Sequence, residues 1–302
     1  MVDYNRWLEQ LDDNIRISKL SLPGTHNSAA CHIALPSVKC QDHSVKTQLK
    51  NGVRFFDFRL GKLFFKDNDQ GAYEADDLQV IHGKFPVRIP LPLKFSSELD
   101  DLFSFLSQNP SETCIVSIKQ EGEDFADKNK EFAQFVWSKY IQPRQNRWYL
   151  RGDIPTLRDA RGKLVLFRRF GLPDELRDRD FGIEAAWWSY STTNEDRGLY
   201  QVQDFCELEH AENIVEKTRY VKEFLDVASN YNCTVDAPSR LFVNFCSGAN
   251  LYDVDCWPEK VADQMLKSDL GSDVKRGCGI LILDYAGKDD WKLVKKIVDS
   301  NF

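Results

Sequence analysis

The chain has 302 residues, of which 42% are hydrophobic and 29% are charged. This composition, with a mean hydropathy of −0.47, is typical of a folded globular protein and excludes a disordered or membrane-embedded chain. The net charge of −7 argues against broad electrostatic binding to nucleic acid or to an anionic bilayer, so an anionic ligand requires a local cluster of cations.

Neither a membrane span nor a leader peptide is apparent. No apolar run approaches the ~20 residues of a spanning helix, and residues 1–6 lack a basic and apolar leader pattern. Unless a leader has been removed, we expect a cytoplasmic or peripheral-membrane protein rather than a secreted one, and a monomer that binds no nucleic acid. The eight cysteines include no Cys-x-x-Cys pair and are expected to be reduced and mostly buried. Two pairs are close enough in sequence for small bridged loops in an oxidising compartment: Cys31 with Cys40, and Cys246 with Cys256.

Short β-branched and aromatic runs alternate with longer amphipathic stretches along the chain. Eight such runs predict an α/β fold, a single (β/α) barrel of the TIM type, distorted or incompletely closed, that forms one domain over residues 1–302. The expected strands are Ile17–Leu22, Val53–Phe58, Leu78–Ile81, Cys114–Ile118, Leu164–Phe167, Tyr200–Val202, Leu241–Phe245 and Ile280–Leu283. The expected helices span 94–107, 125–140, 211–229, 258–267 and 289–300.

Polar residues follow most of the predicted strands. In a parallel barrel, catalytic groups lie at the carboxyl ends of the strands and in the loops after them, so we expect these residues to converge on one mouth. In chain order they are His26, after a tight Pro23-Gly24 turn, then Asp57 and Arg59, His82, Lys119, Arg168 with Arg169, Asp204 and Asp284.

Arg59 is the most informative of these residues, because it lies near the end of the otherwise apolar run Phe55–Leu60. An unpaired guanidinium is costly to bury, so we expect it to face an anionic ligand. A buried ion pair with Asp57 is a second role, compatible with the first. His26 and His82 flank Arg59 in sequence, and this combination indicates acid/base chemistry on a phosphate ester.

Other strand-end residues have structural alternatives. Lys119 and Arg169 are also compatible with solvated surface charges. A carboxylate that follows so apolar a run as Ile280–Leu283 needs a partner, and orienting a histidine is one natural use for Asp284.

These residues carry a resemblance to a known family. The chain resembles the bacterial phosphatidylinositol-specific phospholipases C, single-domain enzymes built on the same X-box barrel as the catalytic core of larger eukaryotic phospholipases C. The resemblance runs over nearly the whole chain. Six segments carry it in order: Leu22–His26, Gly52–Arg59, Val80–Gly83, Asn109–Thr113, Asp159–Lys163 and Leu283–Tyr285.

The resemblance implies cleavage of phosphatidylinositol, held in a membrane surface, into diacylglycerol and inositol 1,2-cyclic phosphate. By this similarity His26 is the general base, His82 is the general acid, and Asp284 orients the base. Arg59 holds the nonbridging phosphate oxygens at the position where calcium-dependent relatives place an acidic metal ligand. We therefore expect no metal requirement and no other cofactor.

The same similarity places three residues on the inositol hydroxyls: Lys119, Arg169 and Asp204. At Cys206 the family often has a tyrosine that stacks on the inositol ring. Because that ring is missing here, Trp187 or Trp188 is expected to cover the inositol instead.

Asn27 departs from the bacterial pattern, in which an aspartate directly after the base histidine supports the acid histidine. A neutral amide stabilises a protonated imidazole less well, so we expect His82 to be a weaker acid or Asp57 to compensate. Calcium-dependent relatives carry asparagine here as a ligand, but the neighbouring arginine makes a poor calcium site. Val38–Ser44 also lacks the rim tryptophan of secreted members, which leaves Trp257 as the alternative interfacial anchor.

Three alternatives stay open. An enzyme that cleaves glycosylphosphatidylinositol anchors would read the same inositol phosphodiester. A glycerophosphodiester phosphodiesterase or a sphingomyelinase-D-like barrel is built around acidic metal ligands, where this chain has Arg59. A non-catalytic barrel that binds inositol phospholipids would keep the pocket without turnover, although the presence of both His26 and His82 favours an enzyme.

Overall fold

The structure, a computed structural model, describes residues 2–62, 76–122, 128–234 and 236–302. Its strands are β1 (Ser21–Thr25), β2 (Phe55–Lys62), β3 (Leu78–His82), β4 (Phe85–Pro86), β5 (Cys114–Gln120), β6 (Trp148–Tyr149), β7 (Leu164–Arg169), β8 (Ile183–Glu184), β9 (Glu195–Asp196), β10 (Tyr200–Gln203), β11 (Leu241–Phe245) and β12 (Gly279–Leu283). Its α-helices are α1 (Val45–Lys50), α2 (Phe95–Gln108), α3 (Lys128–Val136), α4 (Leu157–Ala160), α5 (Asp174–Arg177), α6 (Glu212–Cys233), α7 (Pro258–Lys267), α8 (Leu270–Asp273) and α9 (Lys288–Asp299).

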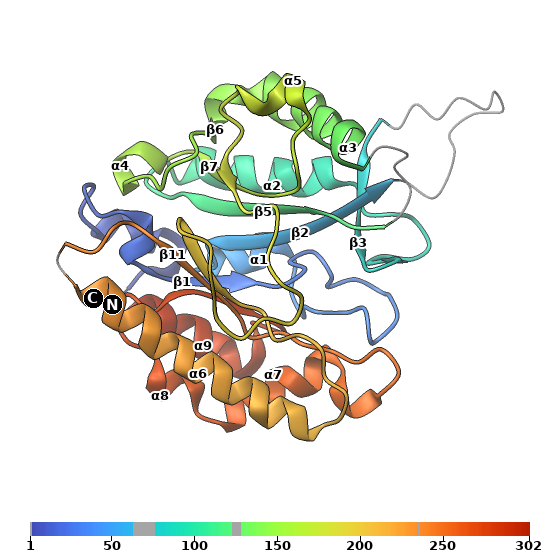
Figure 1. Cartoon of the computed structure of the whole chain (residues 1–302), viewed down its shortest axis with the longest axis vertical. Helices are drawn as coiled ribbons and strands as arrows, with labels where there is room; N and C mark the ends of the chain where they lie inside the picture. Colours follow the sequence, from blue (N-terminus) through green and yellow to red (C-terminus); the bar gives the residue numbers. More distant parts are fainter. Residues whose placement is uncertain (1, 63–75, 123–127, 235) are drawn as a thin grey trace.

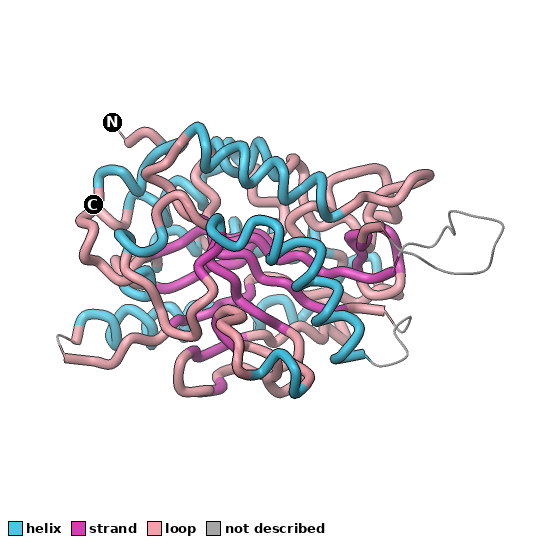
Figure 2. Tube along the Cα trace, turned by 90° about the horizontal axis from the view of Figure 1, so that it is seen from above, coloured by secondary structure: helices cyan, strands magenta, loops and turns pink. Residues whose placement is uncertain are grey.

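The strands form one curled sheet in the order β6-β7-β5-β2-β1-β12-β11-β10-β9. From β7 to β10 every neighbouring pair is parallel. Helices α2 to α5 cover one side of the molecule and α6 to α9 the other, with the two chain ends close together (Figure 1). Figure 2 shows the strands gathered at the centre with helices around them.

The barrel is incompletely closed, as the sequence predicted. At one end of the sheet β8 pairs with β7, and at the other end β9 pairs antiparallel with β10. Within the described part of the chain, no ladder joins these two ends. The result is an open (β/α) barrel of the TIM type.

Alternation along each strand separates two sets of side chains. On β2, Phe55 packs in the cluster inside the barrel, whereas Phe56 and Phe58 pack in the larger cluster beneath the helices. Asp57 and Arg59 have the same phase as Phe55, so they continue the inward-facing row. Apolar side chains therefore fill the amino-terminal half of the barrel and polar ones line its carboxyl-terminal mouth.

The first predicted strand is displaced along the chain. Ile17–Lys19 forms a 3-10 helix, and β1 starts at Ser21 and runs through Pro23 and Gly24, so the predicted turn there is wrong. The strand can continue because Gly24 lacks a side chain: a Cβ would lie 3.0 Å from Cβ of Phe55.

Two further strand predictions need correction. β2 extends to Lys62, so Asp57 and Arg59 lie inside the strand and do not end it. The extension is paired on both edges, with β5 as far as Leu60 and with β3 from Leu60 onward. β3 is antiparallel to β2 and forms a hairpin with β4, so it is not one of the parallel barrel strands.

The helix predictions agree with the structure. The stretches 94–107, 211–229, 258–267 and 289–300 correspond to α2, α6, α7 and α9. Of the stretch 125–140, residues 128–136 form α3 and the chain continues into a π-helical turn, while 125–127 lie outside the described residues. Among the described helices, none is long and apolar enough to cross a bilayer.

Candidate active site

A cavity of about 530 Å³ opens at the carboxyl ends of the parallel strands. Three predicted site residues, Asn27, Asp57 and Asp284, do not line this cavity and are buried. The other eight line it, as the sequence predicted: His26, Arg59, His82, Lys119, Arg169, Trp187, Trp188 and Asp204.

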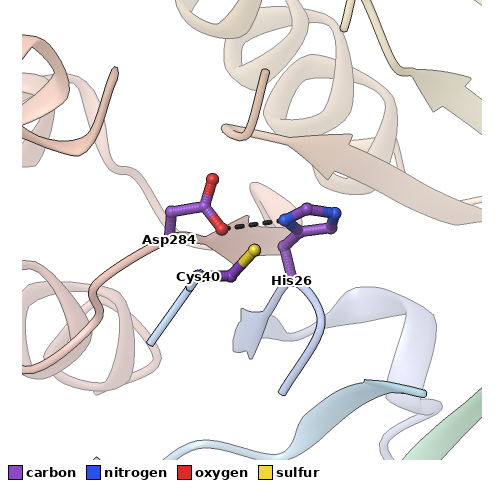
Figure 3. Close-up of side chains that lie close together, drawn as sticks. All are labelled: His26, Cys40 and Asp284. Atoms are coloured by element: carbon purple, nitrogen blue, oxygen red, sulfur yellow. Dashed lines mark hydrogen bonds and ion pairs between the residues drawn. The ribbon is translucent and has the colours of Figure 1, made fainter. Parts of the chain in front are cut away.

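His26 and Asp284 form a buried pair at the mouth. His26 follows β1 directly and Asp284 follows β12, which is the neighbouring parallel strand. The distance from Nδ1 of His26 to Oδ1 of Asp284 is 2.8 Å (Figure 3). Burial, followed by the charge of Arg59, lowers the pKa of His26 well below its ordinary value, and burial raises the pKa of Asp284. A neutral imidazole that donates Nδ1–H to the carboxylate keeps Nε2 unprotonated, as a general base requires.

His82 lies at the end of β3, with its ring edge-on to that of His26 and the two centroids 5.5 Å apart. Its Nδ1 is 3.1 Å from the backbone oxygen of Val38. Burial, and then Arg59, lowers the pKa of His82. Among the carboxylates, Glu121 opposes this shift more strongly than Asp57.

Asn27 gives His82 no hydrogen bond. Its side chain is fully buried, and neither Oδ1 nor Nδ2 has a hydrogen-bond partner among the described residues. Its backbone is in the left-handed region, with φ of 44°. The sequence left two outcomes open, a weaker acid at His82 or compensation by Asp57. Of the two carboxylates, Glu121 raises the pKa of His82 more than Asp57 does.

Asp57 holds both cavity arginines in place. Its Oδ2 accepts a hydrogen bond from Nε of Arg59 at 3.1 Å, and its Oδ1 accepts one from Nη1 of Arg169 at 3.3 Å. Although burial alone would raise its pKa, the two guanidinium groups hold the pKa of Asp57 well below its usual range. Arg59 is therefore paired with Asp57, which confirms the second of the two roles that the sequence allowed for it.

Glu121 is a site residue that the sequence interpretation missed. It accepts hydrogen bonds from Nη1 of Arg59 and Nζ of Lys119, both at 2.9 Å, and from the backbone N–H of Gly83 at 2.7 Å. Burial opposes ionisation, but Arg59 and Lys119 lower the pKa of Glu121 to about 2. A signal was present, because residues two apart on an extended strand share a face and Glu121 is two residues after Lys119.

Trp188 is part of the cavity wall. The guanidinium of Arg169 lies 4.0 Å from the centre of its ring, and its Nε1 donates to Oδ2 of Asp204 at 3.0 Å. Arg168, by contrast, points away and donates to the backbone oxygen of Phe181. Trp188 thus positions two of the predicted inositol-binding residues.

Two exposed aromatic residues lie on the cavity rim. Trp187 is 60% exposed and Tyr190 is 76% exposed, and both line the cavity. Tyr190 also neighbours Cys206, the position at which the sequence lacks a ring. The sequence interpretation named Trp187 and Trp188 from this stretch of chain but missed Tyr190.

All eight cysteines are free thiols, and five of them are buried. Neither of the two conceivable pairs, Cys31 with Cys40 and Cys246 with Cys256, is bridged. Cys40 is close to the buried pair of His26 and Asp284: one ligand atom from each of the three residues lies within 4.8 Å of the others, which identifies them as potential metal ligands.

Comparison with known proteins gives consistent matches. The family model described as "Phosphatidylinositol-specific phospholipase C, X domain" matches residues 20–170. The chain is 28% identical to "1-phosphatidylinositol phosphodiesterase" of Staphylococcus aureus (strain Newman), over 98% of this chain and 93% of that protein. It is 27% identical to the protein of the same name from Listeria monocytogenes, over 99% of this chain and 86% of that protein.

Solved structures agree with the sequence matches. A phosphatidylinositol-specific phospholipase C from Staphylococcus aureus, studied for the modulation of its membrane binding, superimposes with a TM-score of 0.76 at 26% identity, over 99% of this chain and 98% of that one. The enzyme from Listeria monocytogenes gives a TM-score of 0.71 at 22% identity over the full length of both chains. This second likeness concerns the fold alone.

Proposed function

The chain belongs to the phosphatidylinositol-specific phospholipase C X-domain family, and we propose that it cleaves phosphatidylinositol into diacylglycerol and inositol 1,2-cyclic phosphate. The observation that carries this proposal is the pair formed by His26, which is buried, and His82, which is half-buried. Their centroids are 5.5 Å apart, one of them is hydrogen-bonded to a carboxylate, and both line the same cavity as Arg59.

The first half of the reaction is proton abstraction and ring closure. Nε2 of His26 accepts the proton of the inositol 2-hydroxyl while its Nδ1–H stays on Asp284. The 2-oxygen attacks phosphorus in line and forms the new P–O bond inside the substrate, so that no second molecule has to be positioned. Asp284 stabilises the imidazolium that results.

The second half is departure of the lipid. As the bond from phosphorus to the glycerol oxygen breaks, His82 in its imidazolium form protonates that oxygen. The backbone oxygen of Val38, 3.1 Å from Nδ1, accepts Nδ1–H and leaves Nε2 to deliver the proton. The proton taken by His26 and the proton given by His82 balance, so before the next turnover His26 has to lose a proton to solvent and His82 has to gain one.

Arg59 stabilises the charge on the nonbridging oxygens. Asp57 and Glu121 occupy its Nε and Nη1, which leaves Nη2 for the phosphate and fixes the plane of the guanidinium. A donor held in place before the reaction stabilises developing charge without reorganisation. We therefore keep the proposal that Arg59 does this work without a metal.

Lys119, Arg169 and Asp204 bind the inositol hydroxyls in this proposal. Trp188 orients two of these residues through its ring and its Nε1. Tyr190, at the rim beside Cys206, covers the inositol ring in place of the tyrosine that other family members have.

Contact with the membrane is proposed for two neighbouring segments, residues 31–37 and 85–92, which we call the rim segments. They follow the His26 loop and His82 in sequence, and the backbone N–H of Ile89 donates to the oxygen of Ile33 at 3.0 Å. Both present exposed apolar side chains: Ile33, Leu35, Phe85, Ile89 and Leu91.

The expected anchor Trp257 is a weaker candidate for this contact. It is half-buried, and its Nε1 donates to the backbone oxygen of Leu251. In the same stretch Tyr252, which is 95% exposed, is the more accessible aromatic residue.

The direct test is incubation of the purified protein with phosphatidylinositol in excess chelator, followed by phosphorus NMR of the water-soluble product. We expect a cyclic phosphodiester, and we expect its formation to stop in His26→Ala. A reaction that starts only after calcium is added would overturn the metal-free mechanism. If substrate binds without any turnover, the protein is a non-catalytic lipid-binding barrel.

A further inference from the structure

Cys40 is a buried thiol at the catalytic centre to which the reaction assigns no proton transfer. It is fully buried and lies between β1 and α1. Its Sγ is 3.5 Å from Nδ1 of His82, and it projects toward the pair formed by His26 and Asp284 (Figure 3). Three side chains that ligate metals in other proteins thus meet at one point, and a fourth, His82, lies beside Cys40.

The donor types in this group are those that zinc prefers. Imidazole nitrogen, thiolate and carboxylate are its usual ligands, with bonds of about 2.0 to 2.3 Å in a tetrahedron. Such a tetrahedron places its donor atoms roughly 3.3 to 3.8 Å apart. The separations of 2.8 Å between Nδ1 of His26 and Oδ1 of Asp284 and 3.5 Å between Sγ of Cys40 and Nδ1 of His82 are close to this range. The ligand atoms of His26, Cys40 and Asp284 all lie within 4.8 Å of one another.

Asp284 supplies a second and independent observation. Its side chain is 1% exposed, and its Oδ2 has no hydrogen-bond partner among the described residues. A buried carboxylate oxygen without a hydrogen-bond donor is costly. A metal ion that binds this oxygen therefore provides the interaction that the folded protein does not. Calcium and magnesium prefer six or more oxygen ligands, which this group does not offer.

We propose that His26, Cys40, Asp284 and His82 form an inhibitory site for a thiophilic divalent cation such as Zn²⁺. Binding displaces the Cys40 thiol proton to solvent and moves the ring proton of His26, and that of neutral His82, from Nδ1 to Nε2, so that both Nδ1 atoms become metal ligands. The thiolate and the carboxylate together neutralise the two charges of the ion. No oxidation or reduction takes place.

Occupation of this site stops catalysis without closing the inositol pocket. With Nε2 of His26 protonated and Nδ1 on the metal, the base has no lone pair for the 2-hydroxyl proton. As the fourth ligand, His82 has its ring turned away from the leaving group as well. The inhibition rests on the proposed phospholipase activity, whereas the metal binding does not.

Cd²⁺ is the probe for binding, because a cadmium-thiolate bond absorbs in the ultraviolet. Chelator-treated protein is titrated with cadmium chloride, and native protein is compared with Cys40→Ser. Cys278→Ser is the matched control, since Cys278 is also a fully buried free thiol. It directly precedes β12, whereas Asp284 follows the other end of that strand. We expect native protein and Cys278→Ser to show the cadmium-thiolate absorbance when the first equivalent of Cd²⁺ is added. Cys40→Ser should not show it.

Inhibition is measured in parallel with Zn²⁺, each rate being divided by the metal-free rate of the same variant. The half-inhibitory Zn²⁺ concentration should rise at least roughly tenfold in Cys40→Ser, chelator should restore activity, and equal concentrations of Ca²⁺ or Mg²⁺ should not inhibit. Cys40→Ala replaces the serine variant if the latter fails to fold by circular dichroism.

The results separate the possible failures. First-equivalent Cd²⁺ absorbance that persists in Cys40→Ser, or equal inhibition by Ca²⁺, would overturn the site. A protein that shows the Cys40-dependent absorbance but turns over no phosphatidylinositol retains the metal site and loses the proposed function.

Discussion

Asp57 illustrates how one carboxylate organises the site. It is fully buried and contacts Arg59, Arg169, Ser117 and the backbone of Asn27. A buried ion pair contributes little to stability by itself, but here it holds two guanidinium groups at fixed positions. In the proposed mechanism its function is preorganisation of the cations that bind the substrate.

Asn27→Asp tests whether the missing charge limits His82. The left-handed backbone at this position suits asparagine and aspartate equally, and the new carboxylate would stabilise the imidazolium form. We expect the alkaline limb of the kcat/KM profile to move to higher pH, by about one pH unit for each ~1.4 kcal/mol of added stabilisation. Asn27→Gly tolerates the same backbone without a charge and serves as the control. Coinciding pH profiles for the two variants would contradict the idea.

Tyr190→Ala tests the proposed cover on the inositol ring. Stacking of a ring contributes about 0.5 to 1.5 kcal/mol, so we expect KM to rise roughly 2- to 12-fold with little change in kcat. A short-chain, water-soluble phosphatidylinositol separates this effect from membrane binding. Tyr190→Phe keeps the ring and should retain the native KM; a loss as large as that of the alanine variant would assign the effect to the hydroxyl.

At the scale of elements, apolar runs located the parallel strands but not their ends. β2, β5 and β7 each continue into polar residues, as far as Lys62, Gln120 and Arg169. A prediction that relies on apolar residues ends a strand where polar residues begin. In these three strands the polar residues that follow include side chains of the candidate site. The antiparallel direction of β3 depends on pairing with β2, and local patterns do not encode it.

The rim segments carry a prediction at the same scale. Because burial of each large aliphatic side chain contributes about 1.5 to 3 kcal/mol, replacing Ile33 and Leu91 together by aspartate should weaken binding to phosphatidylinositol vesicles by tenfold or more. Vesicle co-sedimentation measures the loss, and the rate on a short-chain monomeric substrate should fall much less. Val227→Asp, a partly exposed site on α6, is the matched control and should bind like native protein. If the double variant and Val227→Asp lost vesicle binding to the same extent, the result would contradict a specific membrane face at the rim segments.

At the scale of the whole molecule, the opening of the barrel forms part of the site. Between β8 and β9, where the sheet does not close, the chain carries Trp187, Trp188 and Tyr190 along the cavity. The sequence predicted an incompletely closed barrel and named the two tryptophans. It could not predict that the gap in the sheet and the wall of the cavity are the same segment, because that depends on which strands fail to pair.

The buried charges also predict how the fold responds to acid. Glu121 has a folded-state pKa of about 2, below that of an exposed glutamate, so the unfolded chain binds its proton first as the pH falls. Its contribution to the free energy of unfolding is present above about pH 4.5 and disappears toward pH 2, and a shift of this size corresponds to about 3 kcal/mol. Asp284, whose pKa burial raises, acts in the opposite direction, so single variants are needed to separate the two.

Urea unfolding of Glu121→Gln and native protein between pH 2.5 and 7, followed by tryptophan fluorescence, measures this contribution. The stability difference should be largest near neutral pH and shrink as the native carboxylate is protonated. Glu223→Gln, which removes an exposed ion pair with Arg219, should cost no more than about 0.5 kcal/mol. A Glu121→Gln deficit that stays constant with pH would show that the ionised carboxylate is not what stabilises this end of the barrel. The arginine at the centre of the site would then owe its position to Asp57 alone.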